Sequence, residues 1–436
     1  MQFRSTKSQN PLVSFKDIVL RCLPPDGGLY VPAELVDMRQ FLLHMDERIT
    51  YPEVVATMVP ALLQGDLNPL SAARVMKSAF DFEPELKQLD DNLSLLTLYN
   101  GPTGVFKDFG VAFLAAVMEE LIKDSRPAMI LSASRGNMGV SMAHAFRERR
   151  GIYSVILYPS GPIRGLDTSA FVTKGGNIIP IQVTGTFDDC QRLIVEAVND
   201  QPFAERYGLT CANAINLGRL LPQCFYYFYA FAKIKDSLRG DLVFSVPCGN
   251  FGNLIAGLYA WKFGMPVKGY IAAMNANDAF GGFIRGNRFV PRPVVSTNSP
   301  ALDIGLPSNY ERLAAFYEES PAVMRNMVYP ASIDDERTFI TINRVYRKHG
   351  EILDPHGAVA FAAAEDLAAS EEFAGHIHSV VLATGHPAKK AALVSRAIGR
   401  DIEIPPRLAR LQRQVDPIAI IKPELEALEG AIASCF

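Results

Sequence analysis

Over most of its length the chain alternates between short apolar runs and longer segments whose apolar positions recur at helical spacing. Short apolar runs bounded by turn residues are typical of buried strands, and a period near 3.6 residues is typical of amphipathic helices. The predicted strands are residues 93–98, 128–132, 154–158, 178–183, 242–246, 267–274 and 379–384. The predicted helices among them are residues 108–122, 139–150, 168–174, 187–199, 219–234 and 253–263, with a last helix from residue 388. This alternation predicts an α/β fold with a largely parallel sheet.

The two flanks of this pattern differ from it. In residues 1–95 helical segments dominate, at 14–22, 38–44, 51–63 and 68–80, with a turn at 24–28 that leads into a short strand. We therefore expect a small, mostly helical leading domain. Residues 280–309 are rich in Gly, Pro and Asn and are predicted to be irregular, and helical patterns follow at 311–318 and 335–349.

Composition narrows the classes of function. The chain has 436 residues, 49% of them hydrophobic, and a net charge of −3, which gives no electrostatic reason to expect nucleic acid or an anionic membrane as a partner. Its six cysteines are scattered without a CxxC pair, which favours reduced thiols over disulfides or a metal site. The first residues lack the apolar core of a signal peptide, and no apolar run is long enough to span a membrane. The sequence therefore predicts a cytoplasmic protein.

The most informative stretch runs from Tyr99 to Phe109, Tyr-Asn-Gly-Pro-Thr-Gly-Val-Phe-Lys-Asp-Phe. It leaves a predicted strand, passes a Gly-Pro turn and places Lys107 in the first turn of a predicted helix. An arbitrary lysine here would keep its amine in water and bury only its stem. A Schiff-base lysine, in contrast, needs an amine that loses its proton easily, which burial and the positive end of a helix both favour. The stretch alone leaves both interpretations open.

A second loop supplies a candidate anion site. Pro-Cys-Gly-Asn-Phe-Gly-Asn at residues 247–253 follows a predicted strand and opens a helix. Its glycines allow backbone N–H groups to converge on a phosphate at the helix start, although a plain strand-to-helix turn has the same composition. The loop lacks the Gly-Lys-Ser/Thr of a P-loop and the spacing of the dinucleotide fingerprint.

Three more strand-end loops carry polar side chains, and strand ends are where open α/β sheets bind ligands. These loops are residues 132–139, 213–219 and 384–389. The first suits a carboxylate or a ring oxygen, or is simply a capping loop. The loop at 213–219 has two asparagines before an arginine, and the loop at 384–389 contains His386. A lone histidine, such as His386 in this loop or His356 elsewhere in the chain, is more often structural than catalytic. Together, these features indicate pyridoxal phosphate as the cofactor. They are a lysine able to form a Schiff base, a loop able to bind phosphate, and the absence of a redox dinucleotide motif.

The lysine stretch resembles the HGPTxxFKDFG motif of the threonine synthase family, within the tryptophan-synthase-β-like class of pyridoxal-phosphate enzymes. The resemblance continues at residues 3–7, 13–15, 25–32, 213–219, 245–252 and 385–389, in the family's order. It implies a fold-type II enzyme with two open α/β lobes: a threonine-synthase-like N-terminal domain at 1–95, a catalytic domain at 96–400 and a tail at 401–436. It also implies a small amino-acid substrate, no metal, no membrane partner, and a monomer or homodimer.

By this resemblance Lys107 is the catalytic residue and holds pyridoxal 5′-phosphate as a Schiff base. The other residues that the resemblance assigns to the cofactor are Asn137, Gly249, Asn250, Phe251, Gly252 and Thr384. Thr384 would hydrogen-bond the pyridine nitrogen. The implied reaction converts O-phosphohomoserine to L-threonine and phosphate by γ-elimination and addition of water at the β-carbon.

The substrate side departs from the family pattern. Asn100 stands where histidine is usual, residues 134–139 replace the family's T-S-G-D-T-G loop, and Arg164 lies near an expected lysine. The candidate substrate-binding residues are Asn100, Ser134, Arg135, Met138, Arg164, Asn216 and Arg219. Three functions remain open. They are threonine synthesis with Arg135 or Arg164 taking the phosphate, a paralogous lyase or replacement reaction on another amino acid with a leaving group, and a non-catalytic descendant.

Overall fold

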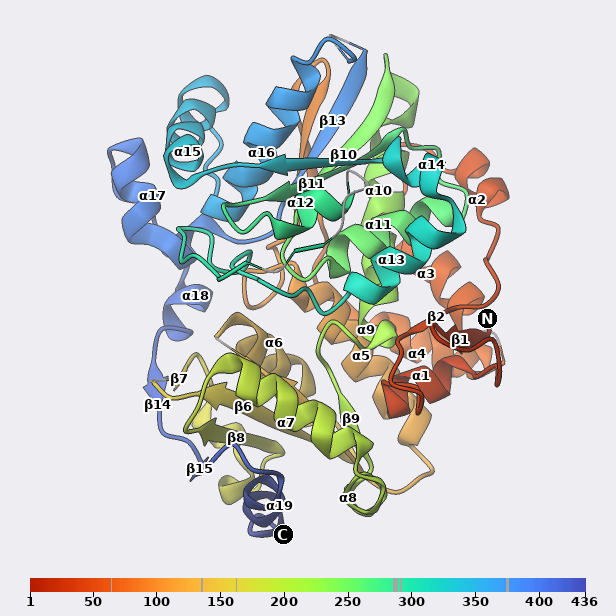
Figure 1. The fold of residues 1–436 in the computed structure, drawn as a ribbon, viewed down its shortest axis with the longest axis vertical. Coiled ribbons are helices and arrows are strands. Elements are labelled where there is room, and N and C mark those ends of the chain that lie inside the picture. The colour runs from red at the N-terminus through yellow and green to blue at the C-terminus, as the bar shows by residue number, and fades with distance from the viewer. Residues whose placement is uncertain (64, 135, 162, 285–288, 291, 374–375) are drawn as a thin grey trace.

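The structure is a computed structural model, and it describes the chain except residues 64, 135, 162, 285–288, 291 and 374–375 (Figure 1). Two separate sheets form two lobes, as the resemblance implies. The larger has the strand order β12-β11-β10-β13-β4-β3, with every neighbouring pair parallel except β3 and β4. Its strands are β3 (Glu85–Asp90), β4 (Leu93–Thr97), β10 (Asp241–Pro247), β11 (Gly269–Met274), β12 (Val328–Ser332) and β13 (Ile377–Ala383).

The smaller sheet has the order β15-β8-β6-β5-β9 and is parallel throughout. Its strands are β5 (Ala128–Ala133), β6 (Ile152–Pro159), β8 (Ile178–Val183), β9 (Leu209–Cys211) and β15 (Ala419–Ile421). A short pair, β7 (Ile163–Arg164) with β14 (Gln414–Val415), joins the C-terminal segment to this lobe. The last residues thus complete the small lobe, because β15 adds a strand and α19 (Leu425–Ala433) packs beside α7.

Both sheets are covered on two faces, which explains why their inner strands are mostly buried and apolar, whereas the edge strand β3 is polar and largely exposed. On β13, Val380 and Leu382 belong to a different buried cluster from Val381 and Ala383, as the two-residue period of a strand requires. The helices on the faces of the large sheet are α10 (Cys224–Ile234), α11 (Gly252–Lys262), α15 (Asp335–His349), α16 (Pro355–Ala368) and α17 (Ala391–Ile398). Those on the small sheet are α6 (Asn137–Phe146), α7 (Phe187–Asn199) and α8 (Gln201–Tyr207).

The N-terminal elements lie beside both lobes, at the right of Figure 1. They are β1 (Phe3–Ser5), α1 (Phe15–Arg21), β2 (Tyr30–Pro32), α2 (Arg39–His44), α3 (Tyr51–Leu62) and α4 (Pro69–Ala79). Helix α5 (Lys107–Ile122) packs against α4 and α6, and so connects this part of the chain to the small lobe. Tyr51 contacts Phe109 and Tyr229 edge to face, which fixes α3 against α5 and α10.

Most predicted elements are confirmed, and the exceptions have physical causes. The predicted helix at 219–234 is divided into α9 (Leu217–Leu220), a 3₁₀ turn (Leu221–Gln223) and α10, with Pro222 at the break. Residues 168–174 form two 3₁₀ turns, Thr168–Ala170 and Val172–Lys174. Within 280–309 the described residues include only one named helix, α12 (Ala279–Ile284). The remaining elements are the helices α13 (Tyr310–Glu319), α14 (Pro321–Arg325) and α18 (Pro406–Arg410), and the 3₁₀ helices Lys235–Ser237 and Pro387–Lys390.

Among the described residues, no helix is both long enough and apolar enough to cross a membrane. No group of three or more His, Cys, Asp or Glu side chains within the described part of the chain is arranged to hold a metal ion. All six cysteines are free thiols, and five of them are buried.

Candidate active site

A cavity of about 420 Å³ lies where the strand-end loops of both sheets converge. The loops after β5 and β9 contribute residues from the small lobe, and those after β10 and β13 contribute residues from the large lobe. The two lobes thus present the carboxyl ends of their strands to one volume, as open α/β sheets do at ligand sites. The described lining includes ten residues of the predicted site or its neighbours: Lys107, Asn137, Met138, Arg219, Gly249, Asn250, Phe251, Gly252, Thr384 and Lys389.

Lys107 is the first residue of α5 and borders this cavity. Burial, which is the largest cause, and the positive charges of Arg219 and Lys389 together lower the pKa of its amine to about 8, whereas Asp108 opposes them. The first turn of a helix adds to this effect, because its unpaired N–H groups disfavour a cation. Lys107 therefore has the easily deprotonated amine that Schiff-base chemistry needs, and a solvated lysine on the surface is excluded.

The glycine loop after β10 has the geometry of an anion cradle. Phe251 takes a left-handed conformation, with φ of 57°, and caps α11 without a side-chain hydrogen bond to its first N–H groups. A Cβ at Gly249 would lie 2.5 Å from the carbonyl oxygen of Ala301, so only glycine fits there. The Asn250 side chain accepts the Ser308 N–H at 2.9 Å and ties the loop to the chain that follows residue 300. The start of α11 is thus left open to a phosphate.

Two buried polar atoms beside this loop have no hydrogen-bond partner among the described residues. The Oδ1 atom of Asn253 accepts hydrogen bonds from Tyr226 (2.6 Å) and Tyr227 (2.8 Å), which leaves its Nδ2 unpaired. The Nε atom of Arg219 is likewise unpaired among the described residues, while its Nη1 donates to the Ala212 carbonyl at 3.0 Å. Buried donors without acceptors cost free energy, so these two indicate a ligand with acceptor oxygens in the cavity. The site fits pyridoxal phosphate in its donor set as well as in its glycine cradle.

The loop after β13 holds the lysine loop in place. The Thr384 carbonyl accepts the Phe106 N–H at 2.9 Å, and Val105 pairs with Gly385 in an antiparallel bridge. The Thr384 hydroxyl makes no hydrogen bond within the described part of the chain, and Thr384 borders the cavity. It is therefore available to a ring nitrogen, the role that the resemblance predicts for it.

Among the described residues that were predicted in the loop after β5, some line the cavity and one instead caps the backbone that follows it. Asn137 and Met138 line the cavity. Ser134 is instead a capping residue, because its hydroxyl accepts the N–H groups of Gly136 (2.9 Å) and Gly139 (2.7 Å). Arg135 lies outside the described residues.

Three other residues that were predicted to bind the substrate make structural hydrogen bonds or lie on the surface instead. Asn216 is buried and caps α9, accepting the Gly218 N–H at 2.9 Å and donating to the Cys211 carbonyl at 2.7 Å. Asn100 donates to the Glu83 carbonyl at 3.1 Å, and Arg164 is exposed on the β7–β14 pair. None of the three is among the described residues that line the cavity.

Sequence reasoning assigned no site role to His356 and Lys389, which also line the cavity. His356 donates Nδ1–H to Asp354 at 2.5 Å, and its Nε2 accepts the Ala301 N–H at 3.2 Å, so the ring is a neutral link between α16 and the loop over Gly249. Lys389 donates to the Thr103 carbonyl at 2.8 Å. The Asp-Pro pair that starts α16 is a helix-start signal that could have drawn attention to His356.

Comparison with known proteins defines the class first. A family model described as "Pyridoxal-phosphate dependent enzyme" matches residues 84–385, so the fold and site are those of a fold-type II pyridoxal-phosphate enzyme. Models described as "Threonine synthase N terminus" and "Threonine synthase, C-terminal" match residues 2–80 and 357–432. The chain belongs to the threonine synthase family.

Individual relatives are similar to this chain over nearly its full length. Threonine synthases of Serratia marcescens and Escherichia coli are each 35% identical over 411 residues, which is 94% of this chain and 94% of theirs. The solved structure of Threonine Synthase from Escherichia coli superposes with a TM-score of 0.88 at 32% identity, covering 100% of both chains. A "PLP bound Threonine synthase from Brucella melitensis" gives 0.86 at 30% identity, covering 100% of this chain and 99% of that one.

Proposed function

We propose that this protein converts O-phosphohomoserine and water to L-threonine and phosphate with pyridoxal 5′-phosphate as cofactor. The observation that carries the proposal is the cavity in which Lys107, with its lowered pKa, faces the glycine cradle of α11. Membership of the threonine synthase family supports the choice of substrate.

The residues that would hold the cofactor follow from the site. Lys107 would bind its carbonyl carbon, the N–H groups of the Gly249–Gly252 loop and the Asn253 amide would bind its phosphate, and Thr384 would meet its ring nitrogen. Asn137 would lie beside the ring. Pyridoxal phosphate bound there would supply an electron sink that acidifies the C–H bonds next to the substrate amino group.

The chain's own part in catalysis is proton transfer by Lys107. Its amine is uncharged near neutral pH far more often than that of a solvated lysine, because burial and two neighbouring cations lower its pKa to about 8. An amine in that range can both take and return a proton, as removal of the α- and β-protons and reprotonation require.

Cations other than Arg135 and Arg164, to which the phosphate was assigned from the sequence, line the cavity and would receive the substrate's anionic groups. Arg219, Lys389 and Lys390 border the cavity together with Lys107. Within the part of the chain that the structure describes, the Nε of Arg219 has no acceptor and Lys389 donates a single hydrogen bond, to Thr103. We therefore assign the substrate carboxylate and phosphate to this group of three cations rather than to Arg164, which is not among the described residues that line the cavity.

The structure also bears on the alternative of a paralogous lyase or replacement enzyme. That alternative arose from departures at Asn100, Arg164 and residues 134–139. The first two do not line the cavity, so their replacement does not alter its described wall. Met138 does line it, and this single observation keeps a different leaving group or nucleophile as the second candidate.

One assay separates the candidates. The purified holoenzyme is incubated with O-phosphohomoserine and, separately, with O-phosphoserine, and phosphate and organic products are followed by NMR. Threonine and phosphate in equal amounts from the first substrate are the expected result. Phosphate with a 2-oxo acid in place of threonine would establish a lyase, and no turnover of either substrate would reject the proposed function.

We further propose that the reaction takes place in the cytoplasm and that the enzyme is a monomer or a homodimer. Six free cysteines support a reducing compartment. Light scattering of the holoenzyme at several concentrations measures the oligomeric state directly, and a larger assembly would contradict this part.

A further inference from the structure

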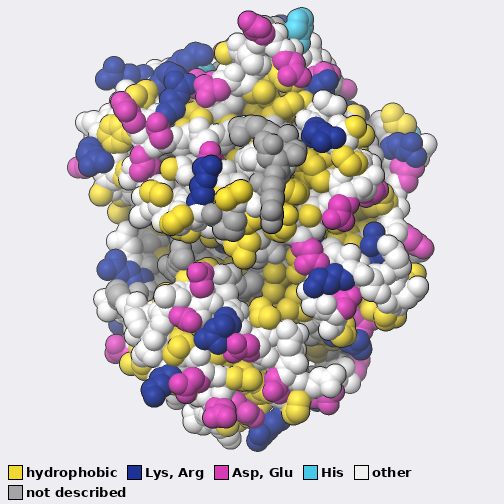
Figure 2. Space-filling view, in the orientation of Figure 1, with side chains coloured by type: hydrophobic (Ala, Val, Ile, Leu, Met, Phe, Trp, Pro, Cys, Tyr) yellow, Lys and Arg dark blue, Asp and Glu magenta, His cyan; other side chains and the backbone are white. Residues whose placement is uncertain are grey.

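Arg312, on helix α13, is a charged side chain in the interior of the molecule. On the face shown in Figure 2, Lys and Arg side chains are scattered among Asp and Glu, with no large area of one sign. Arg312 is not part of such a surface, because it is 0% exposed. Burial lowers the pKa of its guanidinium to about 10, so the group is still a cation at neutral pH. A buried cation is costly unless an anion and hydrogen bonds offset its lost hydration.

The described residues give Arg312 acceptors but no ion-pair partner. Its guanidinium donates only to uncharged oxygen atoms. These are the carbonyls of Tyr30 (2.9 Å), Ala214 (3.2 Å) and Ile215 (2.6 Å) and the Oδ1 atom of Asn309 (2.7 Å). Glu311 favours the charge of Arg312, but its carboxylate accepts the Thr6 hydroxyl and makes no ion pair with Arg312.

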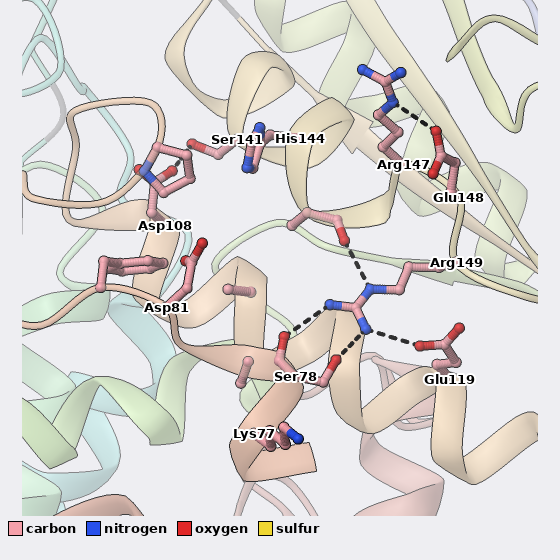
Figure 3. Close-up of a pocket in the computed structure, with 15 residues that line it drawn as sticks. Lys77, Ser78, Asp81, Asp108, Glu119, Ser141, His144, Arg147, Glu148 and Arg149 are labelled. Carbon is pink, nitrogen blue, oxygen red and sulfur yellow. Dashed lines mark hydrogen bonds and ion pairs between the residues drawn. The ribbon is translucent and has the colours of Figure 1, made fainter. Parts of the chain in front are cut away.

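Arg149 shows how another arginine that joins elements of this fold is paired. It borders a second cavity, of about 380 Å³, between α4, α5 and α6 (Figure 3). There it donates to the carboxylate of Glu119 at 2.9 Å, and to the carbonyls of Ser78 and Ala145 at 3.1 Å each. The charge of Arg149 is thus offset within the protein, whereas no described side chain pairs with the charge of Arg312.

Asn309 connects Arg312 to the glycine cradle. A guanidinium can only donate hydrogen bonds, so the Oδ1 atom of Asn309 must face it. The Nδ2 atom then faces the other way and donates to the carbonyls of Ala214 (3.2 Å) and Asn250 (3.1 Å). Asn250 belongs to the cradle, and a Cβ at Gly252 would lie 3.7 Å from this Nδ2 atom. Two successive hydrogen bonds therefore link the buried cation to the cradle.

The hydrogen bond to Asn250 fixes the direction of the next N–H group. In a trans peptide the carbonyl and the N–H that follows it point in opposite directions. The Asn250 carbonyl is held toward Asn309, so the Phe251 N–H points away from Asn309. Phe251 lines the catalytic cavity, and its N–H makes no hydrogen bond within the part of the chain that the structure describes. Arg312 thus orients one donor of the cradle from a distance.

We propose that Arg312 is a positioning residue for the phosphate of pyridoxal 5′-phosphate, and that this phosphate is the anion that balances its buried charge. The inference rests on the proposed placement of the phosphate at the Gly249–Gly252 loop. Arg312 acts through Asn309, which aims the Phe251 N–H at the phosphate. The two opposite charges stabilise each other across the loop, since the interior screens them weakly. The effect is specific to the phosphate and does not extend to the ring or the aldehyde of the cofactor.

The test compares two ligands that differ only in the phosphate. Apoenzyme is titrated with pyridoxal 5′-phosphate and, separately, with pyridoxal, and both dissociation constants are taken from the visible absorbance. Arg312→Met is expected to weaken binding of pyridoxal 5′-phosphate by about tenfold or more, the value of a hydrogen bond to a charged group, and to leave binding of pyridoxal unchanged. Arg312→Lys keeps the charge without the planar fork and is expected to lose less. Equal losses for both ligands would show that Arg312 only supports the fold and would overturn the proposal.

Asn309→Asp tests the same link while it keeps every donor of Arg312. The new carboxylate would pair with Arg312 inside the protein and would place an acceptor against the Asn250 carbonyl. Binding of pyridoxal 5′-phosphate is therefore expected to weaken at least as much as in Arg312→Met, again without a change for pyridoxal. Unchanged binding of pyridoxal 5′-phosphate would overturn the proposal. This variant decides the question if Arg312→Met does not fold.

Two further variants separate the inference from its premise. Arg149→Met removes an arginine that Glu119 already pairs with, and it is expected to leave both dissociation constants unchanged. A loss specific to the phosphate in this control would overturn the special role of Arg312. Gly249→Ala disturbs the cradle directly and is expected to weaken binding of pyridoxal 5′-phosphate. If it does not, the placement of the phosphate is wrong and the inference falls with it. If it does while Arg312→Met and Asn309→Asp bind normally, only the inference is wrong.

Discussion

The Nζ atom of Lys389 donates a hydrogen bond of 2.8 Å to the Thr103 carbonyl oxygen, four residues before Lys107 in the chain. The loop that carries the reactive lysine is therefore attached to a second, half-buried lysine. Since Lys389 contributes to the lowered pKa of Lys107, this hydrogen bond holds a positive charge where it affects the reactive amine.

Lys389→Met tests this relationship through pH. Removing a like charge raises the pKa of Lys107, so the acidic limb of the kcat profile moves to higher pH, by less than about one unit since burial is the larger cause. The profile is measured with saturating O-phosphohomoserine. Lys390→Met is the matched control because Lys390 also lines the cavity but is not among the groups that shift Lys107. A shift to lower pH, or equal shifts in both variants, would contradict the assignment.

Replacement of Lys107 itself has two expected consequences. Lys107→Ala removes the group that would bind the cofactor and move protons, so the visible absorbance of the bound cofactor is lost and kcat falls by roughly 10²–10⁴-fold or more. Absorbance spectra and phosphate release measure the two effects on one preparation. An unchanged visible band in the variant would show that another residue holds the cofactor.

The extent to which the sequence predicted this site depends on whether backbone or side-chain placement is at issue. Lys107 and Gly249–Gly252 were predicted from sequence motifs. In the structure the backbone at these motifs is constrained: Lys107 starts a helix, Phe251 is left-handed, and Gly249 lies under the Ala301 carbonyl. Such constraints act within a few residues, so they are recorded in the local sequence. They were also in the family's order along the chain.

Asn100 shows where this reasoning stops. Its position in the motif indicated the substrate, but its amide donates to Glu83 on the segment before β3, a contact between residues 17 apart that no motif records. Helix α16 was not predicted because residues 355–364 are buried on all sides and so lack an amphipathic period. His356 was considered and interpreted as structural, because only the fold shows that it lies at the cavity and contacts Ala301.

The glycine cradle offers a prediction with a control inside the same loop. Gly249→Ala places a Cβ 2.5 Å from the Ala301 carbonyl, so the loop must move, cofactor affinity drops and stability falls by about 1–3 kcal/mol. Gly252→Ala meets nothing closer than 3.6 Å and keeps its N–H, so affinity changes little. Cofactor titration of the apoenzyme and thermal unfolding measure both. Equal losses in the two variants would show that the cradle is not sterically limited at Gly249.

Asp108 gives a prediction on stability and its dependence on pH. Asp108→Ala leaves the buried Thr103 N–H without an acceptor and costs about 1–3 kcal/mol, whereas Asp108→Asn retains an acceptor and costs less. Burial raises the pKa of Asp108 above that of the unfolded chain, so the native state binds its proton more tightly and wild-type stability falls as the pH rises through that interval. The Asn variant cannot ionise and loses this contribution.

The measurement is urea unfolding of the wild-type and Asp108→Asn holoenzymes at a series of pH values. The free energy of the wild type minus that of the variant is expected to decrease from acid toward neutral pH and then to level off. Other titrating groups cancel in this difference because both proteins share them. A difference that increases with pH would mean that Asp108 is stabilised in its charged form, by Lys389 or by the Thr103 and Ser141 donors, more than burial destabilises it.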